Sequence, residues 1–216
     1  MTTRPALSYI HRFVPASQPG LAPILLLHGT GGDENDLLPL GQMLAPGAAL
    51  LSPRGKVSEG GLTRFFRRFA EGVFDQEDVR RRADELASFV AEARQSYGLG
   101  PPVAVGLSNG ANIAAAVLMR QPAVLTGAVL LRAMTPLEEE AAGSLAGKSI
   151  LILSGSADPI APVENAARLA AILKRAGATV DHRVVPASHG LVQADMEAAR
   201  QWLKHHARPG EPSPAG

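Results

Sequence analysis

Residues 102–116 decide how this chain is expected to fold, and they read Pro-Val-Ala-Val-Gly-Leu-Ser-Asn-Gly-Ala-Asn-Ile-Ala-Ala-Ala. The apolar run 103–107 is typical of a strand buried on both faces of a sheet. Residues 109–121 carry apolar side chains at helical spacing, and this helix-like pattern ends before Pro122. Between them, Gly-X-Ser-X-Gly at residues 106–110 has the pattern of a nucleophile elbow, in which a strand turns sharply into a helix and projects a serine hydroxyl.

A chance match is the competing interpretation of this pattern. Short Gly and Ser patterns recur in loops, and the chain contains 22 glycines. An elbow nevertheless requires glycine at both positions, because a Cβ at position 106 or 110 would clash with the neighbouring strand or helix at the apex. The position between a strand-like run and a helix-like run therefore favours Ser108 as a nucleophile.

Strand-like runs alternate with helix-like segments along most of the chain, which is the pattern of βαβ units. It predicts an α/β fold with a mostly parallel, twisted sheet of about seven strands and helices on both faces. The candidate strands are residues 7–14, 23–28, 48–52, 103–107, 127–131, 149–154 and 179–185. The candidate helices are residues 34–44, 76–97, 109–121, 163–176 and 191–206. Residues 53–75 form a long irregular connection, a feature that is usually functional in a compact domain.

The chain of 216 residues is expected to form one domain over residues 1–207. No insertion is long enough to make a large cap domain. Residues 208–216 contain three Pro and two Gly without apolar periodicity, so a disordered tail is expected there.

Composition excludes several classes of function. The net charge is +1, from 21 Lys and Arg against 20 Asp and Glu, so no general attraction to nucleic acid is expected. No apolar run approaches the roughly 18 residues of a membrane helix, so membrane insertion is not expected either. The chain has no cysteine, which excludes a thiolate nucleophile and thiolate metal ligands. The first residues lack a signal-peptide pattern, and a cytoplasmic location is predicted.

The partners of Ser108 follow from chain order, because in this architecture the acid and then the histidine come after the nucleophile. His189 lies in a loop between the last predicted strand and the last predicted helix. Asp158 lies after a predicted strand, where its carboxylate can accept the imidazole N–H and hold the tautomer. The alternatives are a helix-capping histidine and a plain turn aspartate. Glu164 and Asp195 are weaker candidates for the acid, because both fall within predicted helices.

An oxyanion hole requires two N–H groups near the serine. One is expected from the backbone of Asn109, at the start of the helix. The other is expected from the glycine-rich loop 28–36, at Thr30 or alternatively Gly31. This loop lacks dinucleotide-binding spacing, so a nucleotide site is not expected. His28 is interpreted as a structural residue that forms hydrogen bonds beneath the loop.

Taken together, these segments resemble the phospholipase/carboxylesterase family of small α/β-hydrolases, which includes acyl-protein thioesterases and bacterial carboxylesterases. The matching motifs are residues 27–34, 106–110, 155–159 and 188–190, in that order. The resemblance implies an α/β-hydrolase fold and a triad of Ser108, Asp158 and His189. It also implies no metal or organic cofactor, and homodimers are common in such families.

A bacterial branch of short-chain carboxylesterases and hydroquinone-linked hydrolases is the more similar part of the family, because residues 53–55 and 64–68 resemble its loop. The elbow departs from the thioesterase members, which have Gly-Phe-Ser-Gln-Gly, since Leu107 and Asn109 flank the serine here. The departure favours a short-chain ester over a protein thioester.

The sequence thus predicts a serine carboxylesterase that hydrolyses small or short-chain esters through an acyl-enzyme. A thioesterase or lactonase with the same triad stays open, as does an inactive hydrolase-fold protein that only binds ligand. Side chains expected to bind the small-molecule substrate are Arg64, Phe65, Phe66 and Met134. Arg64 or Arg67 would then face a substrate carboxylate or phosphate. The alternative is that the phenylalanines fill the core and the arginines pair with Glu71, Asp75 and Asp78.

Overall fold

A seven-stranded sheet runs through the centre of the protein, in a computed structural model that describes residues 7–207. The strand order is β1-β3-β2-β8-β9-β10-β11. Strand β1 is antiparallel to β3, and the other neighbouring pairs are parallel, which confirms the predicted sheet. The strands are β1 (His11–Val14), β2 (Ile24–Leu27), β3 (Leu50–Pro53), β8 (Val103–Leu107), β9 (Gly127–Leu131), β10 (Ser149–Gly155) and β11 (Thr179–Val185).

The five predicted helices are also present, with small shifts at their ends. They are α1 (Leu38–Leu44), α2 (Gln76–Tyr97), α3 (Asn109–Arg120), α4 (Val163–Arg175) and α5 (Gln193–His206). Helix α2 has the predicted bounds, because the Asp75 side chain caps the N–H of Asp78 and Gly98 adopts a φ of 67° after the last turn. Helix α1 begins later than predicted, since residues 34–37 form a turn.

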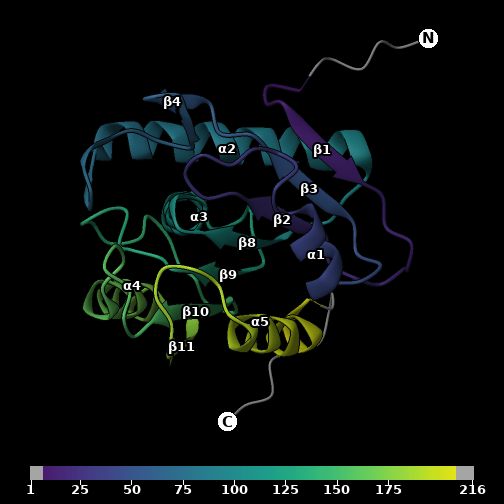
Figure 1. Cartoon of the computed structure of the whole chain (residues 1–216). Helices are drawn as coiled ribbons and strands as arrows, with labels where there is room; N and C mark the ends of the chain where they lie inside the picture. The colour runs from purple at the N-terminus through teal and green to yellow at the C-terminus, as the bar shows by residue number, and fades with distance from the viewer. Residues whose placement is uncertain (1–6, 208–216) are drawn as a thin grey trace.

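Helices cover both faces of the sheet, α2, α3 and α4 on one side and α1 and α5 on the other (Figure 1). Strand β2 shows the alternation that this requires. Leu25 and Leu27 pack in the first core, whereas Ile24 and Leu26 pack in the second, and all four are fully buried. With both faces covered, the ends of the strands are the places where loops can build a site.

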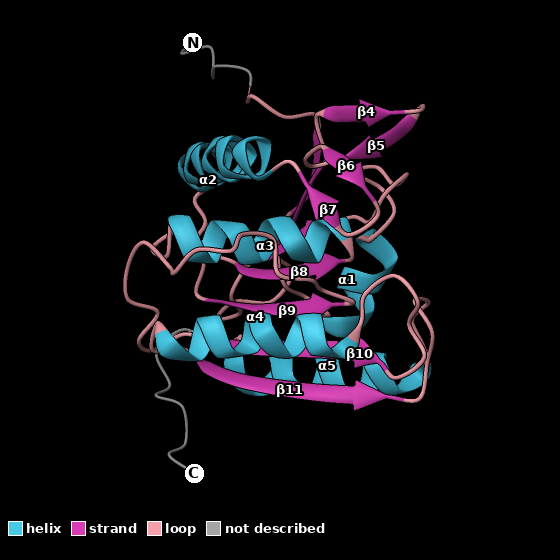
Figure 2. Cartoon of the chain, turned by 90° about the vertical axis from the view of Figure 1, so that its left-hand side faces the viewer, coloured by secondary structure: helices cyan, strands magenta, loops and turns pink. Residues whose placement is uncertain are grey.

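Residues 53–75 differ from the irregular connection that the sequence suggests. They form two hairpins, β4 (Val57–Glu59) with β5 (Leu62–Arg64), and β6 (Arg68–Ala70) with β7 (Val73–Phe74). Strands of two or three residues are too short to show alternation in the sequence. Figure 2 shows both hairpins at the end of the molecule toward which the arrows of the parallel strands point.

The predicted tail, residues 208–216, lies outside the described residues. Within residues 7–207, no helix has both the length and the apolar character needed to cross a membrane.

Candidate active site

Ser108 occupies the apex of a sharp turn between β8 and α3. Its φ is 52°, in the left-handed region, and its N–H donates to the carbonyl of Leu131 at 2.8 Å. A Cβ on Gly106 would lie 2.5 Å from the carbonyl oxygen of Gly110, and a Cβ on Gly110 would collide with the carbonyl oxygen of Leu27. The close passage of strand, helix and β2 therefore requires both glycines, as the elbow pattern predicts.

The structure brings together Ser108 with the predicted acid and base, which are far apart in sequence. His189 Nε2 lies 3.0 Å from Ser108 Oγ. The other ring nitrogen, Nδ1, lies 2.8 Å and 3.1 Å from the two carboxylate oxygens of Asp158. All three residues follow parallel strands, namely β8, β10 and β11, at the same edge of the sheet. The three side chains therefore form one continuous hydrogen-bonded line.

Asp158 combines both roles considered from the sequence, because it stabilises its own turn and contacts the histidine. One carboxylate oxygen accepts the N–H groups of Ile160 at 2.9 Å and Ala161 at 3.0 Å. Burial acts to raise the pKa of Asp158, but these N–H groups and the ring of His189 outweigh it, so the pKa lies below its ordinary value. An ionised carboxylate at this position favours the tautomer with the proton on His189 Nδ1, which leaves Nε2 free to accept a proton.

Thr30 and Asn109, the two residues expected to donate backbone N–H groups to an oxyanion, both lie beside Ser108. Among residues 7–207, neither N–H has a hydrogen-bond partner, and both residues line the same cavity as Ser108. The N–H of Gly31, the alternative donor, is already bonded to the carbonyl of Thr63 at 2.8 Å. The geometry therefore favours Thr30 over Gly31 as the donor from this loop.

His28 lies beneath this loop in a fully buried position. Its Nδ1 is 2.7 Å from the carbonyl oxygen of Gly29, and its Nε2 accepts the N–H of Gly55 at 2.9 Å. The ring also packs against Phe65, with the centroids 4.6 Å apart. Burial lowers the pKa of His28, so the neutral ring joins the loop to the segment after β3.

The cavity beside the serine is small, about 20 Å³. Two of the residues predicted to bind substrate, Arg64 and Met134, line it. The full lining is Thr30, Arg64, Arg68, Glu71, Phe74, Ser108, Asn109, Asn112, Arg132, Met134, Ile160, Ala161 and His189. A larger cavity, of about 460 Å³, lies among loops at the opposite edge of the sheet and contains no residue of the predicted triad. The chemical groups and the larger hollow are thus at different ends of the strands.

Phe65 and Phe66 are not on the cavity, and their assignment to substrate binding was wrong. Their side chains are 2% and 0% exposed and belong to the core. Phe66 packs edge-on against Phe74, which reaches the cavity in its place. The sequence could not separate these aromatic residues, because all of them lie in the segment without a recognisable period.

Arg64 and Arg67 have different surroundings. Arg64 is 3% exposed and donates from Nη1 to the Thr30 hydroxyl at 2.7 Å, while its Nε lies 3.2 Å from Glu59. Arg67 is not among the residues that line the cavity, and it pairs with Asp75 at 2.8 Å. The ion-pairing interpretation is therefore correct for Arg67, whereas Arg64 combines a place on the cavity with a contact to the oxyanion loop.

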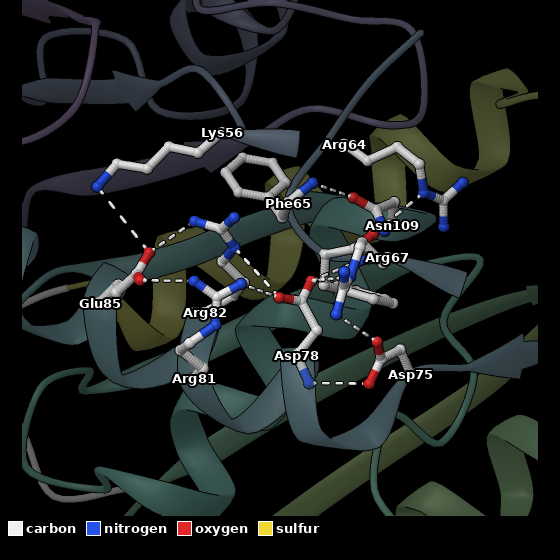
Figure 3. A network of polar contacts seen from close by, with 11 residues as sticks. Lys56, Arg64, Phe65, Arg67, Asp75, Asp78, Arg81, Arg82, Glu85 and Asn109 are labelled. Carbon is white, nitrogen blue, oxygen red and sulfur yellow. Dashed lines mark hydrogen bonds and ion pairs between the residues drawn. The ribbon is translucent and has the colours of Figure 1, made fainter. Parts of the chain in front are cut away.

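Figure 3 shows how the hairpin segment is fastened to the elbow and to α2. The N–H of Phe65 donates to the side-chain oxygen of Asn109 at 2.7 Å. The N–H of Arg67 donates at 2.8 Å to Asp78, whose side chain is fully buried. The side chain of Asn109 thus holds one wall of the site, a contact that the sequence does not predict.

Comparison with known proteins shows which family this chain belongs to. The family described as phospholipase/carboxylesterase matches residues 68–207. The Bacillus subtilis protein MhqD, which is described as a hydrolase, is 43% identical over 183 residues, or 84% of this chain and 92% of that protein. A carboxylesterase structure from Bacillus cereus is 41% identical with a TM-score of 0.89, over 91% of this chain and 94% of that one. A carboxylesterase structure from Mesorhizobium loti is 34% identical with a TM-score of 0.86, over 92% and 95%.

Proposed function

The chain belongs to the phospholipase/carboxylesterase family of α/β-hydrolases, and we propose that it is a serine carboxylesterase that acts through an acyl-enzyme. One observation carries the proposal, the unbroken line of hydrogen bonds from Asp158 through His189 to the hydroxyl of Ser108. This arrangement supplies the base that a serine hydroxyl needs to become a nucleophile at neutral pH.

The reaction begins when Ser108 Oγ attacks the ester carbonyl and His189 Nε2 takes the hydroxyl proton. The negative charge that develops on the carbonyl oxygen is stabilised by the N–H groups of Thr30 and Asn109. His189 then returns the proton to the departing alcohol, and the acyl group stays on Ser108. Water attacks this acyl-enzyme while His189 acts again as the base, which releases the acid and restores the serine. Asp158 holds the ring and stabilises its protonated form in both halves.

The size of the cavity favours a small acyl group. At about 20 Å³, the hollow beside Ser108 is far smaller than the roughly 300–1,000 Å³ pockets that enclose drug-sized ligands, so it does not enclose a long acyl chain. Short-chain carboxylic esters are therefore the proposed substrates. A thioester or a lactone presents the same carbonyl to the same atoms, so a panel of the three substrate types is needed to rank them.

Replacement of the nucleophile tests this proposal. We expect Ser108→Ala to lower kcat on p-nitrophenyl acetate by roughly 10⁴- to 10⁶-fold, the loss found when a triad nucleophile is removed. Stopped assays of released p-nitrophenol, with circular dichroism to check folding, provide the measurement. The same loss of activity is not expected of an inactive ligand-binding protein, which would show no activity to lose.

Ser154→Ala is a matched control, because Ser154 also contacts a histidine. Its Oγ lies 3.0 Å from His182 Nε2, but it is absent from the residues that line the cavity. This variant should keep kcat within about twofold of the parent, since the oxyanion donors are elsewhere. Full activity in Ser108→Ala would contradict the proposed function.

A further inference from the structure

Arg132 has a backbone conformation that is rare for residues other than glycine. It follows β9 directly, is 1% exposed, and has a φ of 56°. Within residues 7–207, Ser108 is the only other residue besides glycine with a positive φ. A side chain is strained in this region, and such strain concentrates at functional sites. The two strained residues follow adjacent parallel strands, β8 and β9.

The guanidinium of Arg132 holds the backbone on both sides of His189. Its Nε donates to the carbonyl of Ser188 at 3.0 Å, and its Nη2 donates to the carbonyl of Gly190 at 2.9 Å. Its Nη1 adds a longer contact of 3.3 Å to the carbonyl of Leu153. The loop that carries His189 is therefore fixed at the residue before it and at the residue after it.

Asp195 orients this guanidinium from the first turn of α5. The two carboxylate oxygens accept from Nη1 at 2.9 Å and from Nη2 at 2.7 Å, and both side chains of the pair are fully buried. One of these oxygens also accepts the N–H of Val192 at 2.8 Å. With these bonds and the three carbonyls, all five N–H donors of Arg132 are in use, so none is left to bind a substrate.

The backbone of the same segment contacts the nucleophile. The N–H of Ser108 donates to the carbonyl of Leu131, and the N–H of Arg132 donates to the carbonyl of Leu153, both at 2.8 Å. Leu131 and Arg132 thus bond to the apex of the elbow on one side and to the histidine loop on the other.

We propose that Arg132, oriented by Asp195, is a positioning residue that holds His189 in register with Ser108. The proposal rests on the proposed function of Ser108 and His189. Stability alone does not account for the pair, because buried ion pairs can often be replaced by apolar residues of similar size without loss of stability. Geometry does account for it, since a misplacement of about 1 Å between reacting groups can cost roughly 100-fold in rate.

Two variants separate positioning from folding. Arg132→Lys keeps the charge but has three donors on one atom, which cannot span both carbonyls. The double variant Arg132→Met with Asp195→Leu removes both charges and leaves no unpaired carboxylate. For each we expect kcat on p-nitrophenyl acetate to fall about 10- to 100-fold with KM within about twofold, because ester binding is not what Arg132 provides.

A matched control is the pair Arg120–Asp84, which joins α3 to α2 through two hydrogen bonds of 2.7 Å and 3.1 Å. Arg120→Lys and the double variant Arg120→Met with Asp84→Leu should leave kcat within about twofold of the parent, since neither residue lines the cavity. The rate of labelling by a fluorophosphonate is measured on all variants. It should fall in parallel with kcat in the Arg132 variants and be unchanged in the controls.

The results of these experiments show whether Arg132 positions His189. Folded Arg132 variants whose kcat and labelling rate stay within twofold of the parent would overturn it. Failure of both Arg132 variants to fold would also overturn it, because the pair would then be a requirement of the fold. Absence of labelling in the parent protein would instead refute the proposed function and leave the fold intact.

Discussion

At the scale of single residues, His28 shows how surroundings select one protonation state. Its Nδ1 faces the carbonyl oxygen of Gly29 and its Nε2 faces the N–H of Gly55. A proton on Nε2 would set two N–H groups against each other in a buried position. The pKa of His28 is accordingly lowered, with burial as the main cause.

This lowered pKa predicts a dependence of stability on pH. Below about 6.5, the ordinary value for histidine, the unfolded chain gains a proton that the folded chain resists. The stabilisation is therefore complete above that pH and is lost as pH falls toward the folded pKa. We expect the free energy of unfolding, measured with urea, to decrease on acidification by up to about 1.4 kcal/mol for each unit of lowering.

Two variants show how much of this pH dependence of stability comes from His28. His28→Gln should flatten the decrease between about pH 6.5 and pH 5, because it removes the titrating ring. Burial also lowers the pKa of His182, so His182→Gln should remove a separate part of the slope and serves as the control. An unchanged slope in His28→Gln would show that His28 is not held neutral.

Individual residues were predictable from sequence only where a motif or chain order constrains them. Ser108 is marked by its flanking glycines, and Asp158 and His189 by their order and their places after strands. Arg132 and Asp195 are 63 residues apart and carry no such mark. Their partnership depends on tertiary packing, so the sequence offers only a lone arginine after a strand and an aspartate in a helix.

At the scale of elements, Gly106 and Gly110 allow the strand and the helix of the elbow to pass close to each other and to β2. The Cβ of an alanine at position 110 would meet the backbone of Leu27 and His28, which cannot move without disturbing β2. We expect Gly110→Ala to lower the free energy of unfolding by at least about 2 kcal/mol, as overpacking against a rigid neighbour does. Activity should fall with it, since the N–H of Asn109 shifts. Chemical denaturation and ester hydrolysis measure the two effects.

Gly100→Ala is the control for this substitution. Position 100 precedes the same strand, but a Cβ there meets no atom within 4 Å. Its stability should stay within about 0.5 kcal/mol of the parent, as for most surface changes. Equal stability of Gly110→Ala and Gly100→Ala would refute the steric account of the elbow.

Long elements were predictable and short ones were not, for a physical reason. Helix α2 has six turns of amphipathic spacing with a capping aspartate and a terminal glycine, so its bounds follow from sequence. The strands of the two hairpins are held mainly by contacts outside themselves, such as the bond between Phe65 and Asn109. The local sequence does not predict these contacts, so it does not predict the short strands that depend on them.

At the scale of the whole molecule, the parallel sheet gathers distant residues at one edge. Ser108 and His189 are 81 residues apart in the chain, yet both follow strands that run in the same direction. This convergence is what made a site predictable from chain order. The homodimer, the cytoplasmic location and the absence of a cofactor stay predictions.

Mass spectrometry after treatment with a fluorophosphonate shows whether Ser108 is the nucleophile. The parent protein should gain one adduct, mapped to the peptide that contains Ser108, because only an activated serine reacts rapidly. Ser108→Ala should gain none, and His189→Ala should react far more slowly. An adduct on a different residue, or equal labelling of Ser108→Ala and the parent, would show that Ser108 is not the nucleophile.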